Sequence, residues 1–204
     1  MANFIASPGD FLRGSIKVPG DKSISHRSIM LGSIANGVTN VSGFLEGEDT
    51  LATLNAFKDM GVKIEREGSN VTINGVGMNG LRPSLKPLNL GNSGTSIRLM
   101  TGLLSAQSFD SILCGDESLS KRPMARIIDP LSEMGAIIKS SNSMPPLSIS
   151  GNQKLSALKY TLPVASAQIK SCLLLAGLYA DGETCITENA TTRDHTERML
   201  KGFG

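Results

Sequence analysis

The chain has 204 residues, 40% of them apolar, and its 20 basic and 18 acidic side chains nearly balance. This composition is ordinary for a globular domain with a core, and no basic block with interleaved aromatics points to nucleic acid as a partner. Cys114, Cys172 and Cys185 are scattered, so neither a disulfide framework nor a zinc site is expected. No stretch approaches the roughly 18 to 20 apolar residues of a membrane span. We therefore expect a cytoplasmic protein without a membrane partner.

The first predicted elements are a strand at 14–18 (GSIKV) and a helix from Ser23 that is small and polar at its front and almost wholly apolar behind. A β-type stretch at 38–43 follows, then an amphipathic helix at 49–61 and two strands within 62–75. Together they form one unit with the order strand, helix, strand, helix, strand, strand.

The same order recurs along the chain, with amphipathic helices that end on glycine at intervals of roughly 70 residues. A terminal glycine suits the left-handed cap of a helix. The second and third units contain apolar helices at 93–107 and 166–182, β stretches at 111–115 and 184–188, and amphipathic helices at 122–135 and 193–204, whereas the final pair of strands follows only in the second unit, at 136–151.

Three such units predict an α/β fold with pseudo-threefold repetition of β-α-β-α-β-β, the apolar helices buried and the amphipathic ones outside. The units span about 14–80, 85–151 and 157–204. Because the third lacks its last two strands, we expect a truncated sequence. Residues 1–13 precede the first unit, and we expect them to contribute a strand to another domain.

Each apolar helix begins with small hydrogen-bond donors and one cation. Because a helix N-terminus has unpaired N–H groups and a partial positive charge, such a front attracts anions. If the packing brings the three fronts together, they form a site for phosphates or carboxylates. The candidates are Gly20, Lys22, Ser23, Ser25 and Arg27 in the first unit, Gly91, Asn92, Ser93, Gly94, Thr95 and Arg98 in the second, and Ser166, Gln168 and Lys170 in the third.

Simpler explanations compete with this one. A serine before a helix is often only a cap, although three in register with cations favour a function. The GDKS run is no P-loop, because the upstream glycine of that motif is missing. We expect His26 to pack or hydrogen-bond rather than act as a base. Arg122 either lies in a solvated turn or meets an anion at a helix start, and Arg193 occupies the equivalent place in the third unit.

Five motifs in order resemble the 5-enolpyruvylshikimate-3-phosphate synthase family, in its class II bacterial form: PGDKSISHRS, LGNSGTSIRLM, GDESLSKRPM, PVASAQIKSCLLLAGL and TRDHTERML. The resemblance covers essentially the whole chain. It implies two similar domains, each an inside-out α/β barrel of three units, of which this chain is the N-terminal portion, with 14–204 in one domain and 1–13 in the other.

The family's reaction would transfer the enolpyruvyl group of phosphoenolpyruvate to the 5-hydroxyl of shikimate 3-phosphate and release phosphate, without metal or organic cofactor. The full-length protein would be a monomer. Because the family's acid/base aspartate, a catalytic lysine and glutamate and several arginines belong to its second half, we expect no turnover from this chain alone. Glyphosate would occupy the phosphoenolpyruvate site.

The resemblance also assigns residues, with Lys22 as the catalytic one. For shikimate 3-phosphate it implies contacts from Lys22, Ser23, Arg27, Ser166, Ala167 (through its backbone), Gln168 and Arg193. For phosphoenolpyruvate it implies Lys22, Gly94, Arg122 and Gln168, with the loop shaped by Asn92, Thr95 and Arg98. Glycine rather than alanine at position 94 implies a glyphosate-sensitive enzyme.

Two alternatives remain at this point. UDP-N-acetylglucosamine enolpyruvyl transferase shares the architecture, but that family has a lysine-asparagine pair near its N-terminus and a catalytic cysteine loop, and this chain has DKSISHR and no such loop. The other alternative is an anion-binding module that is not an enzyme.

Overall fold

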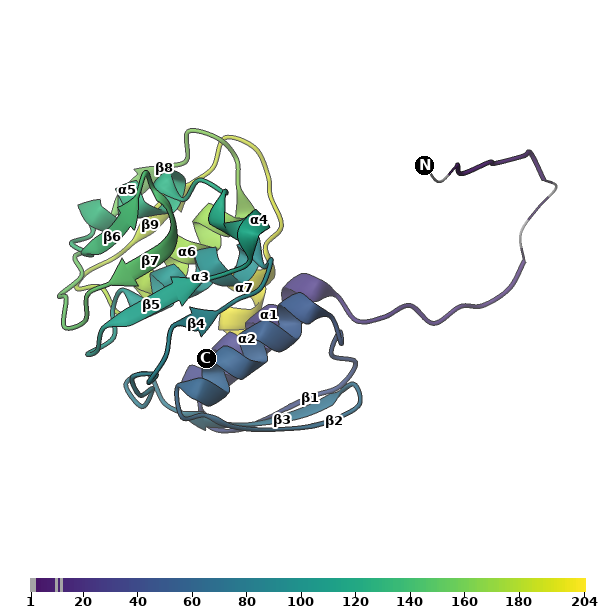
Figure 1. Cartoon of the computed structure of the whole chain (residues 1–204), viewed down its shortest axis with the longest axis horizontal. Coiled ribbons are helices and arrows are strands. Elements are labelled where there is room, and N and C mark those ends of the chain that lie inside the picture. Colours follow the sequence, from purple (N-terminus) through teal and green to yellow (C-terminus); the bar gives the residue numbers. More distant parts are fainter. Residues whose placement is uncertain (1–2, 10, 12) are drawn as a thin grey trace.

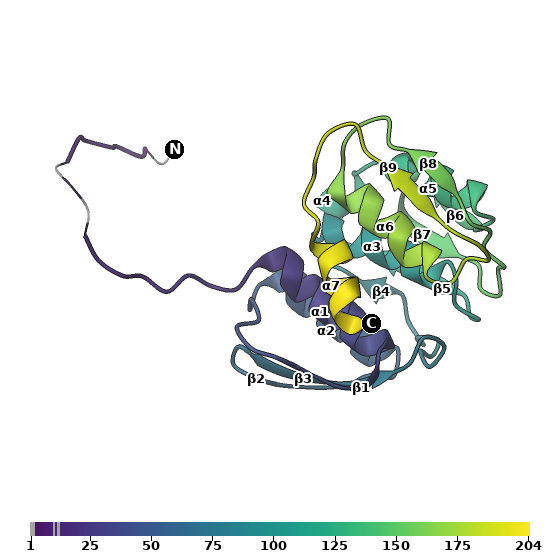
Figure 2. The ribbon, with the colours of Figure 1, turned by 180° about the vertical axis from the view of Figure 1, so that it is seen from behind.

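The computed structural model describes residues 3–9, 11 and 13–204 (Figure 1). The first unit contains α1 (Lys22–Ile34), β1 (Asn36–Val41), α2 (Glu48–Asp59), β2 (Lys63–Glu67) and β3 (Asn70–Val76). Its strands form an antiparallel sheet in the order β1-β3-β2. Figures 1 and 2 show this sheet covering one side of α1 and α2.

The second unit repeats this plan with a strand added at its start. It contains β4 (Leu88–Asn89), α3 (Gly94–Leu104), β5 (Ser111–Cys114), α4 (Glu117–Ser120), α5 (Ala125–Glu133), β6 (Ile138–Ser141) and β7 (Met144–Ile149). The sheet order is β4-β5-β7-β6, with β4 parallel to β5 and the other pairs antiparallel.

The third unit contains β8 (Lys159–Thr161), α6 (Ala167–Gly177), β9 (Cys185–Thr187) and α7 (His195–Phe203). Here β8 pairs in parallel with β9, as β4 pairs with β5. The predicted repeat is therefore confirmed for the described residues, except that the first unit lacks its initial strand and the second contains the additional helix α4, and the fold is α/β.

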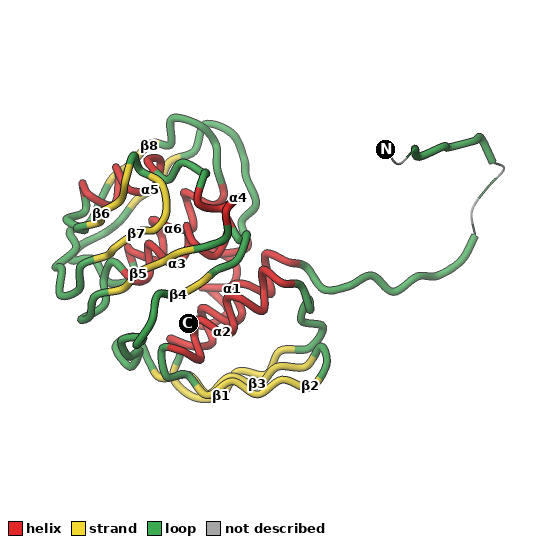
Figure 3. The backbone as a smooth tube through the Cα atoms, viewed as in Figure 1, coloured by secondary structure: helices red, strands yellow, loops and turns green. Residues whose placement is uncertain are grey.

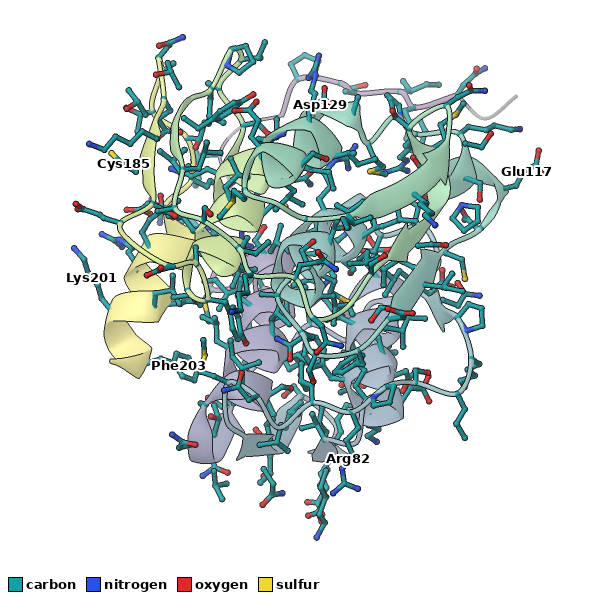
Figure 4. The ribbon with its side chains drawn as sticks, turned by 90° about the vertical axis from the view of Figure 1, so that its left-hand side faces the viewer. Arg82, Glu117, Asp129, Cys185, Lys201 and Phe203 are labelled. Atoms are coloured by element: carbon teal, nitrogen blue, oxygen red, sulfur yellow. The ribbon has the colours of Figure 1, made fainter. Side chains whose placement is uncertain are left out.

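The three apolar helices α1, α3 and α6 form the core, as predicted. Ile29, Leu99 and Leu173 have no exposed surface. The backbones of α3 and α6 approach closely, because a Cβ atom at Gly102 would lie 2.1 Å from the carbonyl oxygen of Cys172. The amphipathic helices α2, α5 and α7 lie outside; Figure 4 shows Lys201 and Phe203 of α7 at the edge of the molecule.

The glycines at the ends of the amphipathic helices adopt the left-handed conformation that was predicted. Their φ angles are +89° at Gly61, +100° at Gly135 and +94° at Gly204. A residue with a Cβ is disfavoured in this region of backbone space. This cap turns the chain out of α2 and α5 and into the strands that follow.

Two local predictions were wrong. The stretch 14–18 is not a strand: Ile16 and Val18 are 90% and 70% exposed, and in the described part of the chain β1 pairs only with β3. A strand needs a partner for its backbone groups, and none is offered here (Figure 3). The helix expected at 122–135 begins later, as α5 at Ala125, and a short helix α4 that was not predicted precedes it, capped by Asp116 accepting from the Leu119 N–H at 2.7 Å.

Among the described residues, no helix combines the length and apolar character needed to cross a bilayer.

Candidate anion-binding site

A pocket of about 340 Å³ lies where the N-termini of α1, α2, α3 and α6 meet. Its lining residues are nearly all polar and come from every unit: Lys22, Asp49, Asn92, Gly94, Thr95, Arg122 and Gln168. Lys22 is the first residue of α1, Gly94 the first of α3, and Gln168 the second of α6. The structure thus brings together helix fronts that lie far apart in the sequence.

Two larger grooves, of about 770 and 660 Å³, lie elsewhere on the molecule. The first is lined mainly by apolar side chains such as Ile34, Leu178 and Phe203, and the second runs along α2 beside Pro87. Neither collects several cations with amide donors. The smaller pocket is therefore the better candidate for a site that binds small anions.

Hydrogen bonds inside the pocket hold its donors in place. The Gln168 amide donates to the Thr95 hydroxyl at 3.1 Å, which ties α6 to α3. Arg122 donates to the side-chain oxygen of Asn92, and Lys22 pairs with Asp49. Lys22 and Arg122 are the full positive charges at the pocket wall.

Arg98 supports the start of α3 from outside the pocket. Its guanidinium donates to the Gly94 carbonyl at 3.0 Å and to the Pro123 carbonyl at 3.4 Å. Burial, with Arg122 nearby, lowers the pKa of Arg98. The side chain therefore connects the loop that carries Arg122 to the N-terminus of α3.

Side chains already cap the three helix fronts. Asp21 accepts from the Ile24 N–H at 2.8 Å, Ser93 from the Ser96 N–H at 3.1 Å, and Ser166 from the Ile169 N–H at 3.4 Å. Sequence reasoning ranked function above capping, but Ser93 and Ser166 do cap their helices, and Asp21 caps α1 in place of a serine. Each of these bonds satisfies one of the unpaired backbone N–H groups at its helix front.

A second cluster forms beside the pocket around Arg27, which is only 5% exposed. Its guanidinium donates to the Thr196 hydroxyl at 2.6 Å, the Ser171 hydroxyl at 2.8 Å and the Ser23 carbonyl at 2.9 Å. The pKa of Arg27 is lowered by burial. This arginine therefore joins α1 to α6 and α7.

The remaining predicted contacts for shikimate 3-phosphate lie outside the pocket lining, and of these Ser23 and Arg193 are at this cluster. The hydroxyl of Ser23 accepts from Arg193 at 3.3 Å. Ser166 and Ala167 form the start of α6, next to Gln168. The structure thus divides the predicted site residues between the pocket and this neighbouring cluster.

The other candidate residues at the helix fronts stabilise the local backbone rather than line the pocket. The Ser25 hydroxyl donates to the Asp21 carbonyl at 2.8 Å. A Cβ atom at Gly20 would lie 1.7 Å from the Gly43 carbonyl oxygen, so only glycine fits there. Gly91, with a φ of +56°, shapes the loop before α3.

Lys170, predicted as the third cation of the site, is not available to an anion. It is 6% exposed and pairs with Glu188 at 2.9 Å and Glu197 at 2.6 Å. Burial alone would lower the pKa of Lys170, but its hydrogen bonds to both carboxylates raise it. Hydrogen bonds from Thr192 and from Lys170 lower the pKa of Glu188 to about 2.

Sequence reasoning missed a buried network behind the pocket. His26 has no exposed surface, and its Nδ1 lies 2.8 Å from the Thr53 hydroxyl and 3.3 Å from the Ser96 hydroxyl. Burial lowers its pKa to about 4; Lys22 and Arg27 act in the same direction and Asp49 opposes them. The prediction that His26 packs and hydrogen-bonds is confirmed. The network fixes α1, α2 and α3 relative to one another.

Asp49 was also missed, although it is the one carboxylate in the pocket lining. In the sequence it is simply an acidic residue in the first turn of a helix, where the helix dipole explains it. The described residues contain no group of three or more His, Cys, Asp or Glu side chains placed to hold a metal.

Comparison with known proteins identifies the family. Residues 6–204 match the model for EPSP synthase (3-phosphoshikimate 1-carboxyvinyltransferase). Proteins named 3-phosphoshikimate 1-carboxyvinyltransferase are 71% identical in Ruthia magnifica subsp. Calyptogena magnifica and 62% identical in Nitrosococcus oceani, covering 100% and 98% of this chain but only 47% and 46% of those proteins.

The fold agrees with the sequence comparison. A solved structure of EPSP synthase from Acinetobacter baumannii matches with a TM-score of 0.91 at 61% identity, covering 94% of this chain and 44% of that one. The chain therefore spans about half the length of the relatives it matches. Together, the repeated α/β units, the five motifs and these matches show that the chain belongs to the EPSP synthase family.

Proposed function

We propose that this chain supplies one wall of the active site that transfers the enolpyruvyl group of phosphoenolpyruvate to the 5-hydroxyl of shikimate 3-phosphate. The observation that carries the proposal is the meeting of Lys22, Arg122 and Gln168, from different units, in one polar pocket. The family and the names of the relatives support this reaction rather than transfer to a nucleotide sugar.

The pocket's chemistry suits phosphoenolpyruvate, which carries both a phosphate and a carboxylate. The planar guanidinium of Arg122 matches either group with two parallel hydrogen bonds, and the ammonium of Lys22 supplies a compact charge. In the reaction, the 5-hydroxyl gives up its proton and its oxygen bonds to C2 of the enolpyruvyl group, while C3 gains a proton. The tetrahedral intermediate then loses phosphate from C2 and a proton from C3, which restores the double bond. Fixed cations stabilise the negative charge that grows on the departing phosphate.

For shikimate 3-phosphate we propose contacts from the Arg27 cluster and the start of α6. Three of the five N–H groups of Arg27 are engaged within the protein, which holds the guanidinium in place. Ser23 and Arg193 lie beside it, and Ser166, Ala167 and Gln168 approach from α6. Gln168 belongs to both groups of residues, which suits a side chain that contacts both substrates.

Gly94 bears on inhibition by glyphosate. A Cβ atom there would lie 2.8 Å from Nη1 of Arg98 and 2.9 Å from Nη1 of Arg122. Alanine would therefore push both guanidinium groups and narrow the pocket. We propose that an enzyme carrying this chain is glyphosate-sensitive, and that Gly94→Ala raises the inhibition constant for glyphosate more than the KM for phosphoenolpyruvate. Steady-state inhibition measurements test this, and equal changes in both constants would contradict it.

We propose that the transferase domain begins near Pro19, a few residues later than the sequence suggested, because residues 14–18 are exposed, and that the preceding residues belong to a second domain. We further propose that the complete protein is a cytoplasmic monomer that uses neither metal nor organic cofactor and has no nucleic-acid or membrane partner.

A chimera tests the function. The first half of the Ruthia magnifica relative is replaced by this chain, which matches 47% of that protein. We expect phosphate release that depends on both phosphoenolpyruvate and shikimate 3-phosphate, and we expect Lys22→Met to abolish it. The chain alone should release none, since catalysis requires positioned acid and base groups that we assign to the other half. A folded chimera that is inactive while the relative turns over would reject the enzyme and favour a binding module.

A further inference from the structure

The inference concerns Asp49, the carboxylate in the lining of the candidate pocket. A negative charge in a site for anions opposes binding unless it has a function of its own. The side chain of Asp49 is 22% exposed and pairs with Lys22, whose side chain is 51% exposed. In the free protein, therefore, a built-in carboxylate already neutralises one of the two cations of the pocket.

Asp49 is held in this position by its helix and by the network behind it. It lies in the first turn of α2, after Gly47, which has no side chain to cap the helix. The partial positive charge of this helix end favours a carboxylate. The backbone carbonyl of Asp49 accepts from the Thr53 hydroxyl at 3.3 Å, and Thr53 is joined to His26 of α1 and Ser96 of α3. The carboxylate thus keeps a fixed place relative to Lys22.

Arg122, the second cation of the pocket, has a neutral partner rather than a carboxylate. Arg122 donates to the amide oxygen of Asn92, a neutral partner that an incoming anion can replace without separating charges. Lys22, in contrast, must leave a carboxylate to meet the anion. The two cations therefore differ in what a ligand gains by binding them.

Building on the proposed function, we propose that Asp49 is an internal counter-ion of Lys22, which an anionic ligand must displace. A small anion that reaches only Lys22 exchanges one negative partner for another and gains little. A ligand that also reaches Arg122 and Gln168 gains contacts that the free protein lacks. Asp49 then favours substrates with several anchoring groups over free inorganic phosphate, the product of the proposed reaction.

Glu48 provides a matched control. It precedes Asp49 in the first turn of α2, so it carries the same charge at the same helix end. It lines the outer groove along α2 and is absent from the lining of the candidate pocket. Glu48→Gln removes the same charge and the same interaction with the helix dipole without changing the pocket.

The experiment is a calorimetric titration of inorganic phosphate into the 204-residue chain, its Asp49→Asn variant and its Glu48→Gln variant. We expect Asp49→Asn to bind phosphate about two- to fivefold more tightly, the range that a partly exposed ion pair is worth. Glu48→Gln should match the parent within experimental error. Thermal unfolding should show both variants folded, with a slightly larger loss for Asp49→Asn, which gives up the ion pair with Lys22 as well as a first-turn carboxylate.

The outcomes are decisive in both directions. Phosphate binding by Asp49→Asn that equals or falls below that of Glu48→Gln overturns the counter-ion function, as does an absence of phosphate binding in all three proteins. Tightening in Asp49→Asn alone supports it. The transferase proposal is tested separately by the chimera: tighter phosphate binding with an inactive chimera would retain the counter-ion and reject the reaction.

Discussion

Polar residues of α1 have different functions in its first turn and in the turn that follows. Lys22 points into the candidate pocket, whereas His26 and Arg27 are turned inward and almost fully buried. A buried polar group is costly unless it has a hydrogen-bond partner, and here Thr53, Thr196 and other hydroxyl groups provide partners. The polar inner face of α1 therefore fixes the position of the residues that line the site.

Burial of His26 should make the protein less stable in mild acid. Its pKa is about 4 in the folded protein, chiefly because of burial, and the ordinary value is 6.5. The unfolded chain therefore binds the proton more readily, so stability is lost as the pH falls through 6.5. We expect the free energy of unfolding to fall by about 2 kcal/mol from about pH 7.5 to about pH 5.

Urea denaturation at several pH values measures this effect, with His26→Gln as the control that cannot titrate at this position. The variant should lose most of the slope in this range, whatever its stability at neutral pH. Glu188 titrates lower, because its pKa is about 2. An equal slope in both proteins would show that other groups cause the acid sensitivity.

Among single residues, the sequence predicts those whose type suits an anion site and whose position is the start of an apolar helix. Lys22, Gly94 and Gln168 could be predicted because each lies at the front of an apolar helix. The pairing of Lys170 with Glu188 and Glu197 could not, since it depends on how α6 packs against α7 and the preceding loop. Asp49 was missed for the same reason, because its place in the pocket depends on its pairing with Lys22, which lies 27 positions away in the sequence.

At the scale of elements, the close contact of α3 and α6 determines whether their fronts share one pocket. Gly102 lies against the backbone of Cys172, so the two helices approach more closely than side chains would allow. Near the other end of this interface, Gln168 donates to Thr95 inside the pocket. Widening the helix contact at Gly102 would therefore disturb the site as well as the core.

This contact predicts opposite effects for the same substitution in two helices. Gly102→Ala places a Cβ atom 2.1 Å from the Cys172 carbonyl oxygen, and should destabilise the protein by about 1–3 kcal/mol because the backbones must separate. Gly202→Ala in α7 meets no atom within 4 Å, and should stabilise by about 0.5–1 kcal/mol through helix propensity alone.

Chemical denaturation of both variants gives the comparison. Measuring phosphate binding as well tests the link to the site: Gly102→Ala should weaken it, because Thr95 and Gln168 would move apart, whereas Gly202→Ala should leave it unchanged. If Gly102→Ala stabilised the chain to the same degree as Gly202→Ala, the close approach of α3 and α6 would be wrong.

Most elements could be predicted because their apolar periodicity and terminal glycines are local signals. The failures arose where a partner decides the structure. GSIKV has the composition of a strand, but it has no neighbour to pair with among the described residues. The short helix α4, capped by Asp116, was not predicted.

At the scale of the whole molecule, the N-terminal segment stands apart from the folded units (Figures 1 and 3). Phe4, Ile5, Phe11 and Ile16 are between 74% and 100% exposed. Apolar side chains gathered in one exposed segment indicate a surface that another element covers. This fits our assignment of the segment to a second domain, and it implies that the folded units gain little from it.

Removal of residues 1–18 should therefore leave the stability of the remaining chain unchanged. None of the hydrogen bonds between described residues joins 3–18 to the rest, whereas Gly20 lies against the Gly43 carbonyl. We expect the free energy of unfolding to change by less than about 0.5 kcal/mol, as for surface positions that make no contacts, and the urea m-value to stay the same because little surface is buried by this segment.

The matched control is Gly20→Ala, which should destabilise strongly since its Cβ would lie 1.7 Å from the Gly43 carbonyl oxygen. A loss of more than about 1 kcal/mol on removing 1–18 would mean that the segment packs on these units after all, and the domain boundary near Pro19 would have to be abandoned.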